Sequence, residues 1–146
     1  MSRVDVSTEI IIDCPLEKVA HYSANPDNVP DWYVNIQSVE WRTSPPVEIG
    51  SQIAFVANFL GRKMAYTYEI VTLTNESLVM RTAEGPFPME TSYTWQAISD
   101  SSTRMILRNR GEPSGFSVLM TPLMKLMMRR ANQKDLQRLK QVLEVQ

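Results

Sequence analysis

Apolar side chains occupy almost every second position of residues 4–12, and charged or small polar side chains lie between them. Because successive side chains of an extended chain point to opposite sides, this pattern predicts a strand with one buried and one exposed face. Only Ile11 departs from the alternation. Cys14 ends the segment, and the fixed conformation of Pro15 suits the first turn of a helix that follows.

Two short helical segments are expected after this strand. Apolar side chains recur at helical spacing in residues 15–24, and an Asn-Pro pair then stops the pattern. Residues 27–36 predict a second short helix or an irregular turn. Pro30 limits its length, and Trp32 is its natural anchor in the core.

Six further segments have strand-like alternation and are separated by turn-forming residues. They are residues 36–42, 52–58, 63–72, 78–83, 89–98 and 104–110. Short strands at this spacing, joined by tight turns, predict an antiparallel meander. One face is apolar and the other polar, as expected when one face of a sheet meets water.

Residues 116–145 form the only long helical pattern in the chain. Its apolar positions fall into two stripes that are rotated from each other by more than a quarter turn. The first stripe contains Phe116, Leu119, Met120, Leu123 and Met127, and the second contains Leu136, Leu139, Val142 and Leu143. Pro122 removes a backbone donor, so we expect the helix to bend near residues 118–122.

These elements predict an α+β fold in which a seven-stranded antiparallel sheet wraps around a long C-terminal helix, with two short helices after the first strand. The 146 residues are the size of one domain, and we expect residues 1–146 to form it. The chain starts without a signal-peptide pattern and has no run of roughly 20 apolar residues. With a single cysteine, Cys14, these features favour a cytoplasmic protein.

The order of elements resembles the START-like (SRPBCC) helix-grip fold that birch-pollen-type allergens, aromatase/cyclases and lipid-transfer domains share. Local motifs are similar too. Residues 14–19 (CPLEKV), 25–28 (NPDN) and 30–32 (PDW) resemble the opening of the polyketide cyclase/dehydrase and lipid-transport group of that superfamily. The resemblance implies a cavity between the sheet and the last helix, with an apolar small molecule as its occupant.

Aromatic and methionine side chains are the candidate wall of this cavity, because methionine adapts to varied shapes and tyrosine adds a hydroxyl to apolar surface. Any one of them can instead pack an ordinary core, but a mostly apolar wall with a few polar groups is typical of a small-molecule pocket. Thr91 and Asn109 have inward parity and supply such groups. The expected ligand-binding residues are Trp32, Trp41, Phe55, Phe59, Tyr66, Tyr68, Thr91, Tyr93, Trp95, Asn109, Met120, Met124 and Met127.

Binding or transport of a lipid, polyketide or aromatic molecule is therefore the leading interpretation. The alternative is a polyketide cyclase or aromatase-type enzyme, in which the tyrosines, Thr91 and Asn109 of the cavity assist enolisation. A partner-binding module would instead have a packed interior. No Ser, Cys or Lys is placed with a base and an orienting partner, so we assign no catalytic residue. We also expect no metal and no cofactor, since one His and one Cys do not make a zinc site and no phosphate-binding glycine motif occurs.

The last helix also has a basic character, with two acidic side chains, Asp135 and Glu144, against six basic ones. The basic residues are Lys125, Arg129, Arg130, Lys134, Arg138 and Lys140. We expect a solvated outer face, and the alternative is transient contact with a membrane surface. The aromatic residues are not interleaved with the basic ones, so nucleic acid is not an expected partner. The sequence leaves the oligomeric state open.

Overall fold

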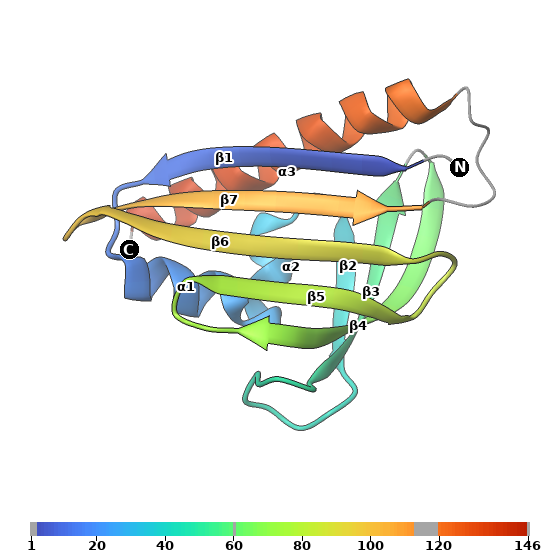
Figure 1. Cartoon of the computed structure of the whole chain (residues 1–146), viewed down its shortest axis with the longest axis horizontal. Helices are drawn as coiled ribbons and strands as arrows, with labels where there is room; N and C mark the ends of the chain where they lie inside the picture. The colour runs from blue at the N-terminus through green and yellow to red at the C-terminus, as the bar shows by residue number, and fades with distance from the viewer. Residues whose placement is uncertain (1–2, 60, 113–119, 146) are drawn as a thin grey trace.

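The computed structural model describes residues 3–59, 61–112 and 120–145. Within them, seven strands form one antiparallel sheet in the order β1-β7-β6-β5-β4-β3-β2, as Figure 1 shows. The strands are β1 (Val4–Ile12), β2 (Ile36–Trp41), β3 (Gln52–Phe59), β4 (Arg62–Leu73), β5 (Ser77–Glu84), β6 (Met89–Ser99) and β7 (Ser102–Gly111). The predicted seven-stranded antiparallel sheet is confirmed, with β2 to β7 as a meander and β1 paired to β7.

The helices are α1 (Leu16–Ala24), the single 3₁₀ turn η1 (Pro26–Asn28), α2 (Val29–Trp32) and α3 (Thr121–Glu144). The second predicted helical segment is thus shorter than residues 27–36. The Asn25 side chain accepts a hydrogen bond from the Asp27 backbone N–H at 3.0 Å and starts η1. Pro30 lies in the first turn of α2, where its missing N–H costs nothing, and the helix ends at Trp32.

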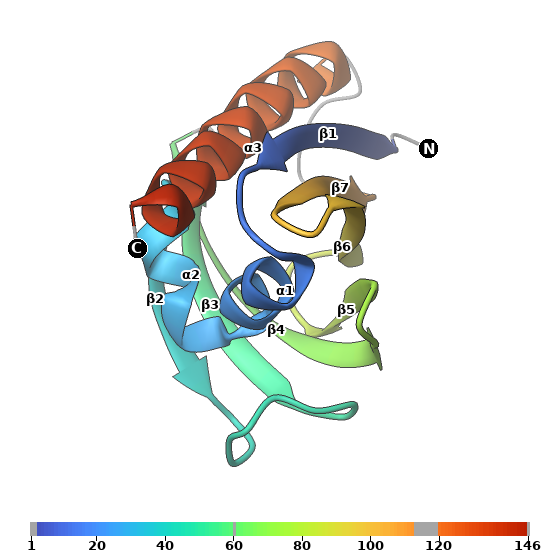
Figure 2. The same ribbon diagram turned by 90° about the vertical axis from the view of Figure 1, so that its left-hand side faces the viewer.

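Helix α3 runs along the gap between the two edge strands of the curled sheet, β1 and β2, as Figure 2 shows. Its C-terminal end is fastened to the connection between β1 and α1. Lys140 Nζ donates to the Ile11 carbonyl at 2.9 Å, and the Asp13 N–H donates to Glu144 Oε2 at 2.8 Å. The last helix therefore closes the fold by holding the end of the first strand.

The inner face of α3 differs from the predicted one. Leu123 and Met127 of the first predicted stripe are 44% and 38% exposed, so they do not face the sheet. Phe116 and Leu119 lie outside the described residues. The buried positions are Met124, Asn132, Asp135, Leu136, Leu139 and Leu143, which make one continuous face at helical spacing. Asn132 and Asp135 interrupt the apolar residues of that face, so the apolar positions alone formed a pattern of two rotated stripes.

Pro122 lies in the first turn of α3 as the structure describes it, because the helix begins at Thr121. A proline there replaces an N–H that has no partner within the helix. Residues 118 and 119 of the bend predicted near residues 118–122 lie outside the described part of the chain.

The main core fills one end of the curve, where α1, α2 and the C-terminal half of α3 pack on the sheet. Trp32 and Trp95 are completely or almost completely buried there. Trp95 Nε1 donates to Ser23 Oγ at 3.0 Å, and the Ser23 hydroxyl donates to the Val19 carbonyl at 2.7 Å. The indole therefore packs β6 against α1 with its N–H satisfied. No helix among the described residues is long and apolar enough to span a membrane.

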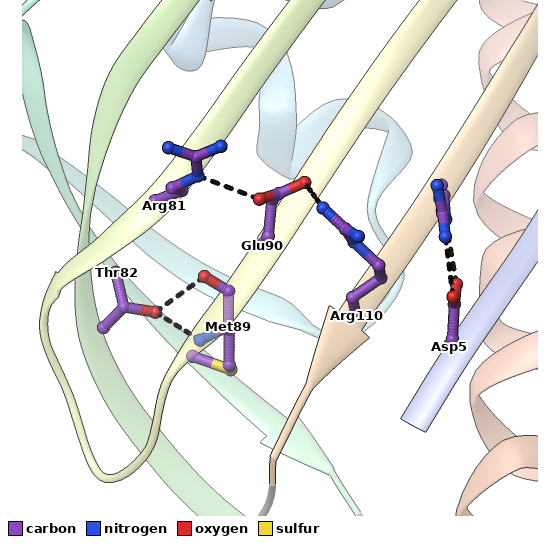
Figure 3. Close-up of polar contacts among 7 residues, drawn as sticks. Asp5, Arg81, Thr82, Met89, Glu90 and Arg110 are labelled. Carbon is purple, nitrogen blue, oxygen red and sulfur yellow. Dashed lines mark hydrogen bonds and ion pairs between the residues drawn. The ribbon is translucent and has the colours of Figure 1, made fainter. Parts of the chain in front are cut away.

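The outer face of β5, β6 and β7 carries paired charges (Figure 3). Arg81 Nε donates to Glu90 Oε2 at 2.9 Å, and Arg110 pairs with the other Glu90 oxygen. Burial raises the pKa of Glu90, but its two arginine partners outweigh this and lower that pKa below its ordinary value. Beside this row, Arg108 binds both oxygens of Asp5 at 2.9 and 2.7 Å.

Candidate functional site

A pocket of about 130 Å³ lies between the inner face of the sheet and the N-terminal half of α3. β3, β4, β6 and β7 supply most of its sheet side, and α3 supplies the opposite wall. It adjoins the main core, with which it shares Phe55, Tyr68 and Met80. Its side chains from β4, β6 and β7 point inward because they have the parity of the buried positions in the alternating pattern.

The wall is mostly apolar. Met124, Met128 and Ala131 contribute from α3, one or two helical turns apart. The apolar and aromatic residues of the sheet side and its connections are Val4, Tyr33, Ile36, Phe55, Ala57, Phe59, Met64, Tyr66, Tyr68, Met80, Phe87 and Met89. Phe55, Tyr66 and Tyr68 form a group of rings whose centroids are 5.0 to 6.0 Å apart. This packing fixes the aromatic part of the wall.

A row of hydrogen bonds crosses from the sheet to the helix. The Thr91 hydroxyl donates to Asn109 Oδ1 at 2.5 Å, and Asn109 Nδ2 donates to Asn132 Oδ1 at 3.0 Å. Tyr68 and Thr91 share a bond of 2.8 Å between their hydroxyls. Because Thr91 has one proton and gives it to Asn109, Tyr68 is the donor in that bond. The row therefore runs in one direction, from Tyr68 on β4 to Asn132 on α3.

Asn132 and Asp135 are one turn apart on α3 and are 4% and 3% exposed. Asp135 Oδ1 accepts the Val34 backbone N–H at 2.9 Å. Burial raises the pKa of Asp135 to about 7, although that hydrogen bond and the charge of Arg138 oppose the shift. The Asp135 carboxyl is therefore part protonated and part ionised at neutral pH.

The tyrosines of this region stay protonated. Burial raises the pKa of Tyr68 to about 12 and raises the pKa values of Tyr33, Tyr66 and Tyr93 as well. The nearby Asp135 charge adds to the shifts of Tyr33, Tyr66 and Tyr93. These hydroxyls can donate hydrogen bonds at neutral pH but cannot take up protons. Among the titratable groups of the described lining, Asp135 is the one that can do both.

Seven of the residues predicted to bind a ligand line this pocket. They are Phe55, Phe59, Tyr66, Tyr68, Thr91, Asn109 and Met124. All but Met124 come from strands whose alternation was assigned correctly, so their inward direction follows from parity. Their contact with a ligand stays a prediction.

The other six predicted residues lie elsewhere. Trp32, Tyr93 and Trp95 are in the main core, although the Tyr93 hydroxyl bonds that of Tyr33, a lining residue, at 2.7 Å. Trp41 lies in a groove beside α1, where its Nε1 donates to Asp27 Oδ1 at 2.7 Å. Met120 packs near Val4 and Val6, and Met127 is exposed, because the inner face of α3 was assigned to the wrong side of the helix.

Sequence reasoning missed the polar part of α3. Asp135 was placed on a solvated outer face, whereas the structure buries it. Asn132, Met128 and Tyr33 were not among the predicted residues. A signal was present: Asn132 and Asp135 stand in helical register with Met124, Met128 and Leu139. Polar residues on the apolar stripe of a long helix indicate a functional interior or a buried hydrogen-bond network.

No group of three or more His, Cys, Asp or Glu side chains in the described ranges is arranged to hold a metal ion. The pocket thus offers hydrogen bonds, apolar surface and one carboxyl group with a pKa near neutrality.

Comparison with solved structures gives the same architecture over nearly the whole chain. A protein from Thermus thermophilus has a TM-score of 0.84 at 19% identity, and the match covers 97% of both chains. The Zhui aromatase/cyclase from a Streptomyces species has a TM-score of 0.81 at 13% identity, covering 97% of this chain and 94% of the other. A START superfamily protein from Mycobacterium smegmatis has a TM-score of 0.81 at 14% identity, covering 96% and 97%.

At these identities the structural matches establish the helix-grip fold and nothing finer. None of the curated proteins matches the sequence. The family model described as "Polyketide cyclase / dehydrase and lipid transport" matches residues 3–144, which is almost the whole chain. The chain therefore belongs to the polyketide cyclase/dehydrase and lipid-transport family.

Proposed function

We propose that the protein binds a small, mostly apolar molecule in the pocket between the sheet and α3. The observation that carries this proposal is the composition of the wall, in which apolar side chains surround a short row of hydrogen-bonding groups. Such a wall is the general character of small-molecule sites. The family description, which includes lipid transport, supports the same class of ligand.

The size of the pocket limits its occupant. Its volume of about 130 Å³ is similar to the roughly 150 Å³ of an engineered cavity that takes up benzene. The occupant therefore has an apolar body of about one or two aromatic rings, or a short aliphatic chain. A larger molecule would require the wall to rearrange, and Met124 and Met128 are the side chains best suited to do so.

A substitution that fills the pocket tests this proposal. Ala131→Phe places a ring in the pocket from the α3 side, whereas Gln133→Phe adds the same ring at an exposed position of the same helix. Calorimetric titration with 2-naphthol should show binding to the native protein and to Gln133→Phe, and loss of binding to Ala131→Phe with an unchanged circular dichroism spectrum. Equal binding to all three proteins would place the ligand elsewhere.

Native mass spectrometry of protein purified from its own host provides an independent measurement. We expect a small apolar molecule to stay with the native protein and with Gln133→Phe, and to be absent from Ala131→Phe. Extraction and identification of that molecule would give the natural ligand. A molecule that stays with Ala131→Phe in the same amount would contradict the assignment of the pocket.

A second function, cyclase or aromatase-type catalysis on a polyketide-like or aromatic substrate, is favoured by one observation. Asp135 lines the pocket, and burial raises its pKa to about 7, which suits a general base that works at neutral pH. The ionised carboxyl would take a proton from the carbon beside a ligand carbonyl. The electron pair would move to the carbonyl oxygen as an enolate, and the protonated carboxyl would then return a proton to the carbon.

Deuterium exchange into 2-tetralone tests this second function without knowledge of the natural substrate. In D₂O, the native protein should speed the replacement of the hydrogens beside the carbonyl, and Asp135→Asn should abolish the acceleration. Proton NMR follows the exchange directly. A native protein that binds 2-tetralone but leaves the exchange at its rate in buffer would be a binding protein without this catalytic step.

A further inference from the structure

We propose that Asn132 and Asp135 form a subsite that recognises the oxygen of a neutral hydroxyl or carbonyl group and discriminates against carboxylates. The ligand class is therefore a phenol, an enol or a hydroxyketone with a small apolar body. This inference rests on the binding function proposed above and names the chemistry that the pocket selects.

The first observation is a buried donor that the fold leaves without a partner. Asn132 Nδ2 has no hydrogen-bond acceptor among the described residues, although Asn132 is 4% exposed and lines the pocket. Leaving a buried polar group unpaired is costly, and such groups are rare in folded proteins. A ligand oxygen that accepts this N–H removes the cost, so the protein has a built-in preference for a ligand with an acceptor at this point.

The direction of the hydrogen-bond row explains why the free group is a donor. Tyr68 donates to Thr91, Thr91 donates to Asn109, and Asn109 donates to Asn132 Oδ1. The carbonyl oxygen of Asn132 is therefore engaged, and its amide nitrogen is the group without a partner among the described residues. Each bond strengthens the next when they point the same way.

The second observation is the carboxyl group one turn along α3. Asp135 Oδ1 accepts the Val34 backbone N–H at 2.9 Å, and that bond does not involve the second oxygen, Oδ2. When ionised, this oxygen accepts a hydrogen bond from a ligand hydroxyl, and when protonated it donates one to a carbonyl. With Asn132 beside it, a neutral oxygen group meets complementary partners in either state.

A carboxylate would meet a different environment. Bringing a second negative charge into a buried site beside Asp135 is unfavourable, because like charges repel strongly where water is scarce. Arg138 acts on Asp135 from the same helix, and Tyr33, Tyr66 and Tyr93 face it as neutral hydroxyls. Arg110 also lines the pocket, but its guanidinium pairs with Glu90 on the outer face of the sheet. The site is therefore poorly equipped for an anion.

Three probes with the same apolar body test the subsite: naphthalene, 2-naphthol and 2-naphthoate. At pH 8 the native protein should bind 2-naphthol about tenfold more tightly than naphthalene, the effect of one well-made hydrogen bond to a buried group. It should bind 2-naphthoate more weakly than naphthalene. Asn132→Leu, which has nearly the same shape, should bind 2-naphthol and naphthalene equally, whereas Gln133→Leu should behave as the native protein.

Asp135→Asn provides a second variant whose effect has the opposite sign. It removes the charge and keeps an oxygen for the Val34 N–H, so its affinity for 2-naphthoate should rise about tenfold at pH 8. If naphthalene binds but 2-naphthol gains nothing, the subsite is wrong and the binding function stands. If naphthalene itself does not bind, both proposals fail. An unchanged affinity of Asp135→Asn for 2-naphthoate would also overturn the subsite.

Discussion

The backbone N–H of Val34 donates to Oδ1 of Asp135 at 2.9 Å and joins two residues that are 101 positions apart. This bond fastens the segment after α2 to the middle of α3, at the border between the main core and the pocket. It also fixes one oxygen of a buried carboxyl group, and the proposed subsite uses the second oxygen. Asp135 therefore connects the stability of the fold with the chemistry of the pocket.

The pH dependence of stability should report on Asp135. Its pKa in the folded protein, about 7, lies above the ordinary value of 3.8, so the folded state binds more protons than the unfolded state between these values. The contribution of Asp135 to the free energy of unfolding should therefore fall as the pH rises from about 4 to about 7, by up to about 4 kcal/mol. Tyr33, Tyr66 and Tyr93 stay neutral over this range, so these three hydroxyls add no opposing slope.

Asp135→Asn should remove this dependence, because the amide keeps an acceptor for Val34 and has no charge to desolvate. Urea unfolding at several pH values between 4 and 8 gives the measurement. We expect the variant to be about 2–4 kcal/mol more stable than the native protein at pH 8 and similar to it at pH 4. A variant with the same pH slope as the native protein would show that Asp135 titrates normally in the folded state.

The inner face of α3 can be tested with two leucines of the same helix. Leu139 is fully buried, and Leu139→Ala should cost about 2–5 kcal/mol, from lost apolar burial and the cavity left behind. Leu126 is 45% exposed, and Leu126→Ala should change the stability by less than about 0.5 kcal/mol. Chemical denaturation compares the two, and similar costs would mean that α3 is rotated about its axis from the orientation described here.

The contact between Trp95 and Ser23 predicts a hydrogen-bond effect in the core. Ser23→Ala removes the acceptor of the buried indole N–H, and leaving that donor unpaired should cost about 1–3 kcal/mol. Ser38→Ala, at an exposed position of β2, is the matched control and should cost much less. Thermal unfolding followed by near-ultraviolet circular dichroism should also show a changed tryptophan signal in Ser23→Ala only. Equal stability of the two variants would argue against a structural role for this bond.

The charge row on the outer face should contribute little and should respond to salt. Glu90→Gln breaks both arginine pairs and should cost about 1 kcal/mol at pH 7, because exposed ion pairs are screened by solvent. The pKa of Glu90 is lowered in the folded state, so this contribution is present above the ordinary carboxyl pKa and disappears as the pH falls below it. Urea unfolding should be measured without salt and with about 0.5 M added salt, which is several times the physiological ionic strength. The cost of Glu90→Gln should be smaller with salt. A cost that does not change with salt or pH would indicate that packing, and not charge, explains the effect.

The sheet was predictable from the sequence because its side chains alternate with a period of two and its turns are marked. Met89 begins the strand β6 as predicted, and the register that follows places Thr91 and Asn109 opposite each other on the inner face. Once the alternation is assigned, the direction of every side chain on a strand follows. This is why the candidates on β3, β4 and β7, and Thr91 on β6, lie in the pocket wall. Tyr93 and Trp95 have the same inward parity but lie in the main core.

The helix was less predictable, because its inner face mixes apolar and polar residues. A hydrophobic stripe identifies a buried face only when burial and apolarity coincide, and at Asn132 and Asp135 they do not. Tyr33 was missed for another reason. It lies just after α2, in a segment without periodicity, and only the packing of α2 on the sheet brings it to the pocket. The apolar wall was thus largely visible in the sequence, and the polar end of the pocket was not.

The position of α3 between the two sheet edges also has a consequence for synthesis. Because α3 follows every strand in the chain, all seven strands emerge from the ribosome before the helix that covers them. During that interval the apolar inner face and the edge strand β1 have no cover, a state in which nascent chains associate wrongly or recruit chaperones. The wall that α3 contributes to the pocket forms only when the last helix emerges. Lys140 and Glu144 can then bind the end of the first strand.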